Sequence, residues 1–198
     1  MAVRSSRPAP EVRSSRTLAD ELVGRLRTLH AVKAGALRLF DPMLEALASA
    51  RDGGAHPEVE DLLGRMHSNF SGHREATARH VDRFAARIAE LGGQPADAQR
   101  QAIGLGGALR ARVAAVGGMN FGSAATEAFV FEHLEIAQAQ LAEHLAERTE
   151  DERTATALRE VRADDEEMAA TIGRNWTNVL SLSLATQGLP VLRPAEDG

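Results

Sequence analysis

The sequence contains no cysteine and no tyrosine in its 198 residues. The absence of cysteine excludes disulfides, thiolate zinc sites and iron–sulfur clusters, so any bound metal must rest on His, Asp and Glu side chains. The absence of tyrosine excludes a tyrosyl radical. The sequence also lacks an apolar run near the roughly 20 residues that span a bilayer, and it lacks the apolar core of a signal peptide. We therefore expect a cytoplasmic protein with no membrane partner.

The sequence has only a small excess of negative charge. It contains 28 Asp and Glu residues and 23 Lys and Arg residues, which gives a net charge of −5. Such a balance gives no general attraction for nucleic acid or for anionic membranes. Basic charge gathers only in residues 1–16, which also carry two prolines and four serines. We predict that residues 1–16 form a disordered basic tail. Only weak contact with nucleic acid is expected, through the four arginines of this tail: Arg4, Arg7, Arg13 and Arg16.

Apolar residues make up 43% of the chain and recur at helical spacing in four long segments. These segments cover residues 17–52, residues 57–91, about residues 123–148, and the stretch from residue 152 onward. Between the second and third, residues 96–118 are rich in Ala, Gln and Gly, which predicts a crossover with one or two short helices near 103–105 and 109–116. We predict an all-α, up-down four-helix bundle over residues 17–186, followed by a short tail over residues 187–198.

Capping residues and proline indicate where the helices begin, bend and end. Thr17 with Asp20 predicts a capping box at the first helix, and Thr149 with Glu152 predicts another. Pro42 predicts a bend in the first helix, since proline removes a backbone donor and crowds the preceding turn. Beyond residue 176 the pattern becomes apolar on more than one side. This C-terminal helical extension is expected to continue its helix, to pack across the bundle, or to meet a partner subunit.

Each long segment places ionisable residues on its apolar stripe near the middle of the segment. Antiparallel packing brings such middles to one level of a bundle. A buried unpaired charge costs several kcal/mol, so these residues must pair, lose their charge or bind a metal. In carboxylate-bridged bundles, inward Glu and His side chains hold two metal ions at that level. The residues concerned are Lys33, His73, His80, Glu132, Glu135 and Asp165.

Two interpretations of this set are open. In the first, His73, His80, Glu132, Glu135 and Asp165 are metal ligands, since imidazole and carboxylate groups suit iron, manganese and zinc. In the second, the core is a salt-bridged polar layer without metal. There Lys33 neutralises one carboxylate and the histidines hydrogen-bond to another, as buried polar groups usually do. The second interpretation gains weight because a buried lysine supplies the charge that a metal cation would otherwise supply.

Three stretches of the chain carry a family pattern. Residues 131–137, FEHLEIA, look like an E-H-Y-E-I-A motif. Residues 73–84, with Leu91, Gly92 and Pro95 behind them, are similar to H-x-x-E-T-x-x-H-V-x-R-L followed by L-G-x-x-P, and residues 161–168 correspond to an acidic E-E-E run. Over roughly residues 22–172 the chain thus resembles the YciE/YciF-like ferritin-like proteins of bacteria. The resemblance implies a dimeric ferritin-like bundle that is associated with stress responses and that can carry a two-metal site.

The chain departs from the family pattern at two positions. Lys33 stands where the first helix of the family has a glutamate, and Ala76 stands where the second helix has a glutamate before its threonine. Two carboxylates are therefore missing, and a cation has replaced one of them. We expect either no metal or a single iron or manganese ion, and we do not expect a two-metal site.

The favoured functional hypothesis is a stress-associated, non-enzymatic bundle protein. In this hypothesis the metal site is degenerate and consists of lysine, carboxylates and histidine, and the protein has an interaction or structural role. The alternative is a metal-dependent redox protein that acts on oxygen or peroxide with iron or manganese. Under both hypotheses we expect a homodimer or a higher oligomer.

Overall fold

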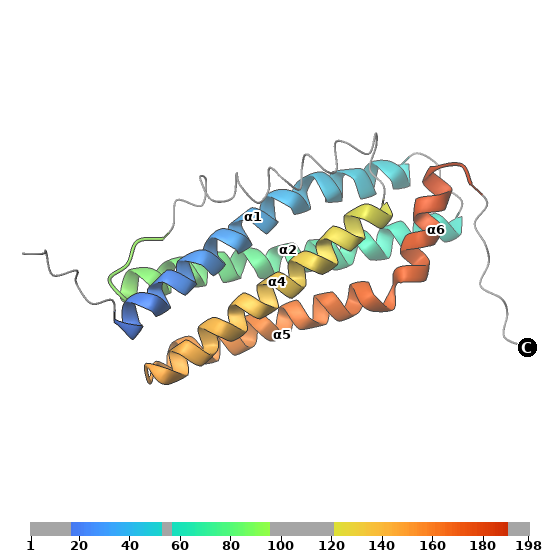
Figure 1. Cartoon of the computed structure of the whole chain (residues 1–198). Coiled ribbons are helices and arrows are strands. Elements are labelled where there is room, and N and C mark those ends of the chain that lie inside the picture. Colours follow the sequence, from blue (N-terminus) through green and yellow to red (C-terminus); the bar gives the residue numbers. More distant parts are fainter. Residues whose placement is uncertain (1–16, 53–56, 96–120, 190–198) are drawn as a thin grey trace, which may run out of the picture.

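A computed structural model of the chain describes residues 17–52, 57–95 and 121–189 (Figure 1). The elements in this part of the chain are all helices: α1 (Leu18–Asp52), α2 (Pro57–Glu90), α4 (Phe121–Arg148), α5 (Glu152–Arg174) and α6 (Trp176–Thr186). The all-α prediction is confirmed. The basic tail predicted over residues 1–16 lies outside the described residues, as do the short helices expected near 103–105 and 109–116 and most of the C-terminal tail.

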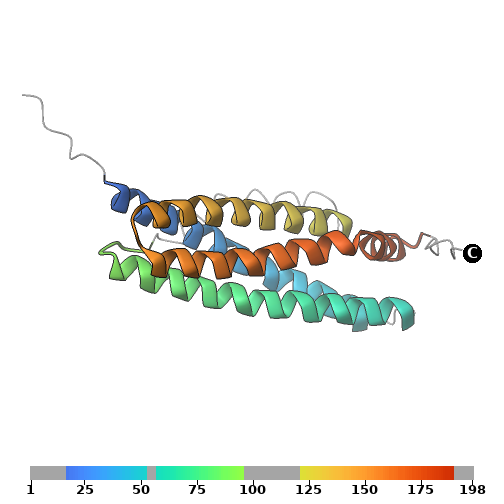
Figure 2. The same cartoon turned by 90° about the horizontal axis from the view of Figure 1, so that it is seen from below.

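The four long helices lie alongside one another, and α6 turns across one end of the bundle (Figures 1 and 2). Close contacts pair α1 with α2 and α4 with α5, and the two pairs meet mainly through α1 and α4. At the α6 end, the backbone N–H of Gly122, at the start of α4, donates to Ser183 Oγ. At the opposite end, Arg87, near the end of α2, binds Asp151, just before α5. Helix α2 therefore ends at the opposite end of the bundle from the start of α4, and the predicted crossover over residues 96–118 lies outside the described residues.

The capping box predicted at the start of α1 is present. The backbone N–H of Thr17 donates to Asp20 Oδ2 at 2.9 Å, and the backbone N–H of Asp20 donates to Thr17 Oγ1 at 3.1 Å. Helix α1 then runs without interruption through Pro42 to Asp52. The bend at Pro42 stays a prediction.

Two glycines end α2, as the sequence predicts. Gly92 has a φ of 76°, and its N–H donates to the carbonyl of Ala89, while the N–H of Gly93 donates to the carbonyl of Ile88. This pair of bonds is the Schellman arrangement that satisfies the last carbonyls of a helix. A Cβ atom on Gly93 would lie 2.6 Å from a methyl group of Val23. Glycine at this position therefore lets the end of α2 approach the start of α1.

The cap of α5 differs from the prediction, because Asp151 is the N-cap and Thr149 is not. The Oδ1 atom of Asp151 accepts from the backbone N–H of Thr154 at 3.1 Å, and its Oδ2 atom accepts from the Thr154 hydroxyl at 2.6 Å. The Thr149 hydroxyl instead donates to carbonyls in the last turn of α4. Glu150, with a φ of 57°, makes the turn between the helices and moves the start of α5 past Thr149.

The C-terminal extension packs across the end of the bundle. Helix α5 stops at Asn175, whose side-chain amide donates to the carbonyl of Thr171 at 2.7 Å. Helix α6 buries Val179 and Leu182 against the bundle and leaves Leu180 exposed. The structure therefore shows packing across the bundle and rules out a simple continuation of α5, while contact of this stretch with a partner subunit stays a prediction. Among the described helices, none is long and apolar enough to cross a membrane.

The buried core consists of two apolar clusters with a polar layer between them. One cluster surrounds the start of α1 and the end of α2, and the other lies toward α6. On each long helix the ionisable residues found on the apolar stripe fall between the two clusters. The first cluster includes Leu22, Leu26, Leu29, Phe84, Ile88 and Leu158, and the second includes Phe40, Phe70, Ala125, Met168, Ile172 and Leu182.

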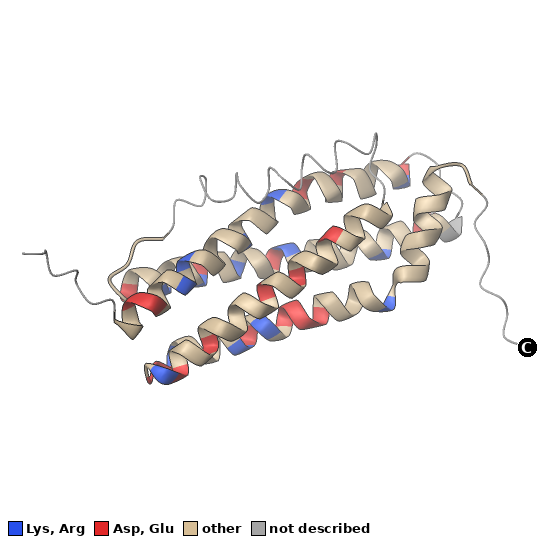
Figure 3. Cartoon of the chain, in the orientation of Figure 1, with Lys and Arg blue, Asp and Glu red and all other residues tan. Residues whose placement is uncertain are grey.

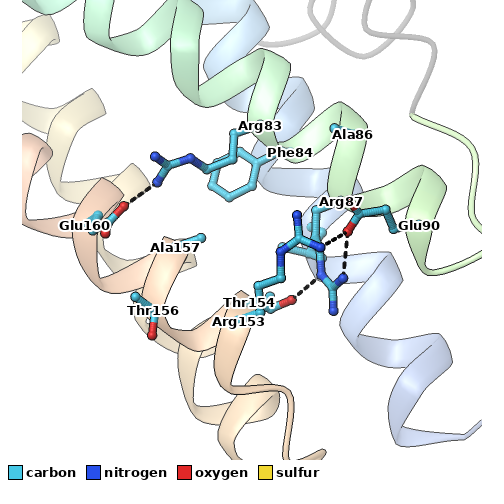
Figure 4. Close-up of a pocket in the computed structure, with 11 residues that line it drawn as sticks. Arg83, Phe84, Ala86, Arg87, Glu90, Arg153, Thr154, Thr156, Ala157 and Glu160 are labelled. Carbon is cyan, nitrogen blue, oxygen red and sulfur yellow. Dashed lines mark hydrogen bonds and ion pairs between the residues drawn. The ribbon is translucent and has the colours of Figure 1, made fainter.

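Arg87 ties the end of α2 to the start of α5 (Figure 4). Its Nη2 atom lies 2.8 and 2.7 Å from the two carboxylate oxygens of Asp151, and its Nε–H donates to Thr154 Oγ1 at 2.7 Å. We expect Arg87→Ala to lower the free energy of unfolding by about 1.5–3 kcal/mol, because charge-assisted hydrogen bonds in a partly buried site are lost. Urea unfolding would measure the change.

Arg83→Ala is the matched control for this prediction. Arg83 also joins α2 to α5, through Glu160 at 2.5 Å, but both side chains are about half exposed (Figure 4). Ion pairs in such positions contribute about 0–1 kcal/mol. Equal losses in the two variants would contradict the special role of Arg87.

Candidate functional site

The polar layer brings together side chains from all four long helices. Five of the six ionisable residues singled out in the sequence meet here, and each is at most 8% exposed: Lys33, His73, Glu132, Glu135 and Asp165. They reach one level because the helices are paired antiparallel and each carries its polar residues near the middle. The structure thus places five of the six residues together, and their role as metal ligands or charge partners stays a prediction.

Lys33 contacts two carboxyl groups in this layer, one more than the salt-bridged interpretation assigned to it. Its Nζ atom lies 2.8 Å from Glu135 Oε2 and 2.5 Å from Asp165 Oδ1. Lys33 is the only lysine in the sequence, and every other non-histidine basic residue is arginine. A lysine ammonium is a compact point charge, whereas the planar guanidinium of arginine needs more room. The single lysine thus stands where a small cation fits between two buried carboxylates.

His73 and Glu132 contact each other on the other side of the layer. His73 Nε2 lies 3.0 Å from Glu132 Oε1, although the two atoms do not have the geometry of a hydrogen bond. The Phe40 ring packs edge-on against the His73 imidazole, with centroids 5.6 Å apart. This contact restricts the orientation of the imidazole ring in the layer.

Four residues of the layer each have a buried polar atom that lacks a hydrogen-bond partner in the described part of the chain. These atoms are His73 Nε2, Glu132 Oε2, Glu135 Oε1 and Asp165 Oδ2. The same four residues can each supply one ligand atom to a group whose members lie within 4.8 Å of one another. Buried polar groups are normally paired. A buried group of one imidazole and three carboxyl side chains, each with an unpaired polar atom, has the chemistry of a cation site.

His80 lies outside this group of four, although the sequence placed it among the candidate ligands. Its Nε2 atom lies 3.0 Å from Asp164 Oδ2, and the Asp164 side chain is 52% exposed. Burial, together with the charge of Lys33, lowers the pKa of His80 to about 4, and the contact with Asp164 opposes this shift only in part. His80 is therefore neutral at neutral pH and connects the layer to the surface through Asp164.

Burial also changes the protonation of the acids next to Lys33. It raises the pKa of Glu135 to about 8 and that of Asp165 to about 6, and in both cases the Lys33 charge opposes the shift. Burial alone would lower the pKa of Lys33, but the two carboxylates outweigh it and raise this pKa above its ordinary value. Because the contact to Asp165 is the shorter one, we assign the ion pair to Lys33 and Asp165 and place a proton on Glu135 at neutral pH.

Two residues of the site have no assigned role in the sequence-based prediction. Thr77 is fully buried on α2 between His73 and His80, and its hydroxyl has no partner among the described residues. Its place on the same helical stripe is the signal that could have indicated it. Asp164 belongs to the acidic run 164–167, which forms the red stretch at mid-length of α5 (Figure 3). In such a run, the sequence alone does not show which neighbour of Asp165 contacts the layer.

Comparison with known proteins gives one match. A protein-family model with the description "Domain of unknown function (DUF892)" matches residues 17–185. No curated protein and no solved structure matches the chain. The matched region includes all four helices that contribute to the polar layer.

Proposed function

This chain belongs to the family described as "Domain of unknown function (DUF892)", and we propose that it is a ferritin-like protein that binds one divalent metal ion, iron(II) or manganese(II), beside Lys33. The observation that carries the proposal is that His73, Glu132, Glu135 and Asp165 are buried and each offers one ligand atom within 4.8 Å of the others. Each of the four residues also has a buried polar atom without a hydrogen-bond partner among the described residues. One imidazole and three carboxylates form a ligand set that suits these metals.

The geometry of the layer supports a metal ion and Lys33 side by side. Ligand bonds of about 2.0–2.2 Å place opposite ligand atoms roughly 4 Å apart across an ion, close to the separation found here. Lys33 contacts the Oε2 atom of Glu135 and the Oδ1 atom of Asp165, while the second oxygen of each carboxylate is unpaired. The lysine and a metal ion therefore do not compete for the same oxygen atoms.

The charge of the layer supports one metal ion over two. Glu132, Glu135 and Asp165 carry three negative charges when ionised, and Lys33 supplies one positive charge. A single divalent ion would complete the balance, whereas two such ions would leave an excess of buried positive charge, which is costly. This supports the expectation of at most one iron or manganese ion.

The residues of the layer would prepare the site for small oxidants. His73 would bind the metal through Nε2 with its ring held by Phe40, and the layer excludes water because each of its residues is at most 8% exposed. Lys33 holds a proton at Nζ beside the site, where it can stabilise negative charge that develops on a bound substrate. When bound, iron or manganese would supply one-electron chemistry with oxygen or peroxide. Such chemistry agrees with the stress association implied by the resemblance to the YciE/YciF-like proteins.

The test is the metal content of the chain, measured by mass spectrometry after anaerobic loading with iron(II) or manganese(II). We expect one equivalent per chain, and we expect it to be lost in Glu132→Gln, because an amide replaces a charged ligand. Glu143→Gln is the matched control, since Glu143 is buried on the same helix but binds Arg162 at 3.1 Å outside the layer. Two equivalents would contradict a single site, and no metal in the loaded wild-type chain would contradict metal binding altogether.

A second candidate function needs no metal. The ion pair of Lys33 with Asp165 and its contact with Glu135 favour a charge-paired core that stabilises the bundle for an interaction or structural role. This candidate predicts no stoichiometric metal and a stability that chelators do not change. Metal loading therefore separates the two, because a ligand that binds only the folded state raises the free energy of unfolding.

A further inference from the structure

Two cavities open along the seam between α2 and α5, one on each side of the polar layer. The first, of about 270 Å³, is lined in part by charged side chains that form ion pairs with one another, among them Arg83 with Glu160 and Arg153 with Glu90 (Figure 4), and we call it the charged cavity. The second, of about 240 Å³, lies toward α6, and we call it the α6-side cavity. Its floor consists of the buried apolar residues Leu62, Phe70, Ala125, Met168, Ile172 and Val179. Its more exposed part is lined by Arg65, Met66, Asn69, Thr171 and Asn175.

The α6-side cavity ends next to the four candidate ligands. Phe70 precedes His73 by three residues on α2, and Met168 follows Asp165 by three residues on α5. Three residues of α-helix correspond to about 4.5 Å along the axis. One layer of side chains, with Phe70 and Met168 as its members, therefore separates the cavity from the site.

The charged cavity is a poorer approach to the same ligands. On α2, Phe84 of its lining follows His73 by eleven residues, which corresponds to about 16 Å along the helix. On α5, Glu160 of its lining precedes Asp165 by five residues, about 7.5 Å, so this cavity ends farther from the ligands on both helices. Between Phe84 and the ligands lie His80 and Thr77, both buried. Its arginines and acids also hold one another in ion pairs across the seam (Figure 4).

We propose that the α6-side cavity is the route by which a small uncharged oxidant, dioxygen or hydrogen peroxide, reaches the candidate metal site. This inference rests on the proposed function. The ligands are almost fully buried, so an organic substrate does not reach them, and an apolar floor disfavours the passage of ions. Met168 has an unbranched, flexible thioether side chain that can move aside for a molecule of two to four atoms.

The test uses iron(II)-loaded protein under anaerobic conditions and nitric oxide as an uncharged probe of the size of dioxygen. The readout is the rate at which the optical absorption of the iron(II)–nitric oxide complex appears in a stopped-flow instrument. Asn69→Trp fills the mouth of the α6-side cavity from an exposed position, and we expect it to slow binding by about tenfold. Met168→Ala widens the inner end, and we expect it to accelerate binding several-fold.

Thr156→Trp is the matched control, because Thr156 is an exposed residue of the charged cavity on the same seam (Figure 4). We expect it to leave the rate unchanged, and all three variants should bind the same amount of iron as wild type. Unchanged rates in Asn69→Trp and Met168→Ala with iron bound would overturn the route and leave the metal site intact. Equal slowing by Thr156→Trp would overturn it as well. A wild-type chain that binds no iron would overturn the route together with the proposed function.

A second experiment distinguishes dioxygen from hydrogen peroxide as the molecule that uses the cavity. The same variants are mixed with hydrogen peroxide and, separately, with dioxygen, and the loss of iron(II) is followed. If the route serves both molecules, Asn69→Trp slows both reactions by the same factor as nitric oxide binding. An effect on one oxidant alone identifies that molecule as the one that uses the cavity. An effect on neither overturns the route.

Discussion

Replacing Lys33 by methionine is expected to lower the free energy of unfolding of the metal-free protein by about 3–5 kcal/mol, because it removes one partner of a buried ion pair. The Lys33 ammonium is fully buried and lies within 2.8 Å of both Glu135 and Asp165. Methionine has a similar length and fills the same space, so the loss measures the missing charge and not a cavity. Urea unfolding in the presence of a chelator would give the value.

A double variant shows whether stranded charge is the cause of this loss. Lys33→Met combined with Asp165→Asn removes the lysine and its closest carboxylate charge together, so little unpaired charge is left in the core. We expect the double variant to be more stable than Lys33→Met alone, which is the non-additivity of residues in direct contact. A loss below about 1 kcal/mol in the single variant would contradict a charge-paired core, because truncating one partner of a buried pair costs more than that.

The affinity of the protein for manganese(II) is expected to rise about a hundredfold between pH 6 and pH 8, since a protonated carboxyl must lose its proton before it binds metal. Burial raises the pKa of Glu135 to about 8. Below this pKa, each unit of pH leaves about tenfold less of the ionised form, which weakens binding by the same factor. Calorimetric titration at pH 6, 7 and 8 would measure the affinity, and buffers of different ionisation enthalpy would count the protons released.

Glu135→Gln is the control for this pH dependence. The amide does not titrate, so we expect weaker binding whose dependence on pH between 6 and 8 is much shallower than in wild type. Asp165, with a pKa raised to about 6, would still contribute near the lower limit of this range. An affinity of the wild-type protein that does not change with pH would contradict both the protonated state of Glu135 and its place among the ligands.

Local sequence signals predict the ends of helices well when all the residues of the signal lie within a few positions of one another. The capping box of Thr17 and Asp20 and the glycines at the end of α2 act through hydrogen bonds to neighbouring backbone groups, and both are present. The cap of α5 is wrong by two residues, because the positive φ of Glu150 makes the turn between α4 and α5. Glutamate rarely adopts this conformation, so the pattern of residue types does not indicate it.

The sequence by itself determined that the protein is helical, that no metal ligand can be a cysteine thiolate, and which residues occupy the buried stripe of each helix. Helical periodicity is local, so it sets the face on which a residue lies. Only the tertiary structure decided which stripe residues meet. Lys33 contacts Glu135 and Asp165, which lie 102 and 132 residues away in the sequence, whereas His80 contacts Asp164. The reason is physical: the height and rotation of each helix in the bundle are set by the packing of the two apolar clusters, and no local pattern contains that information.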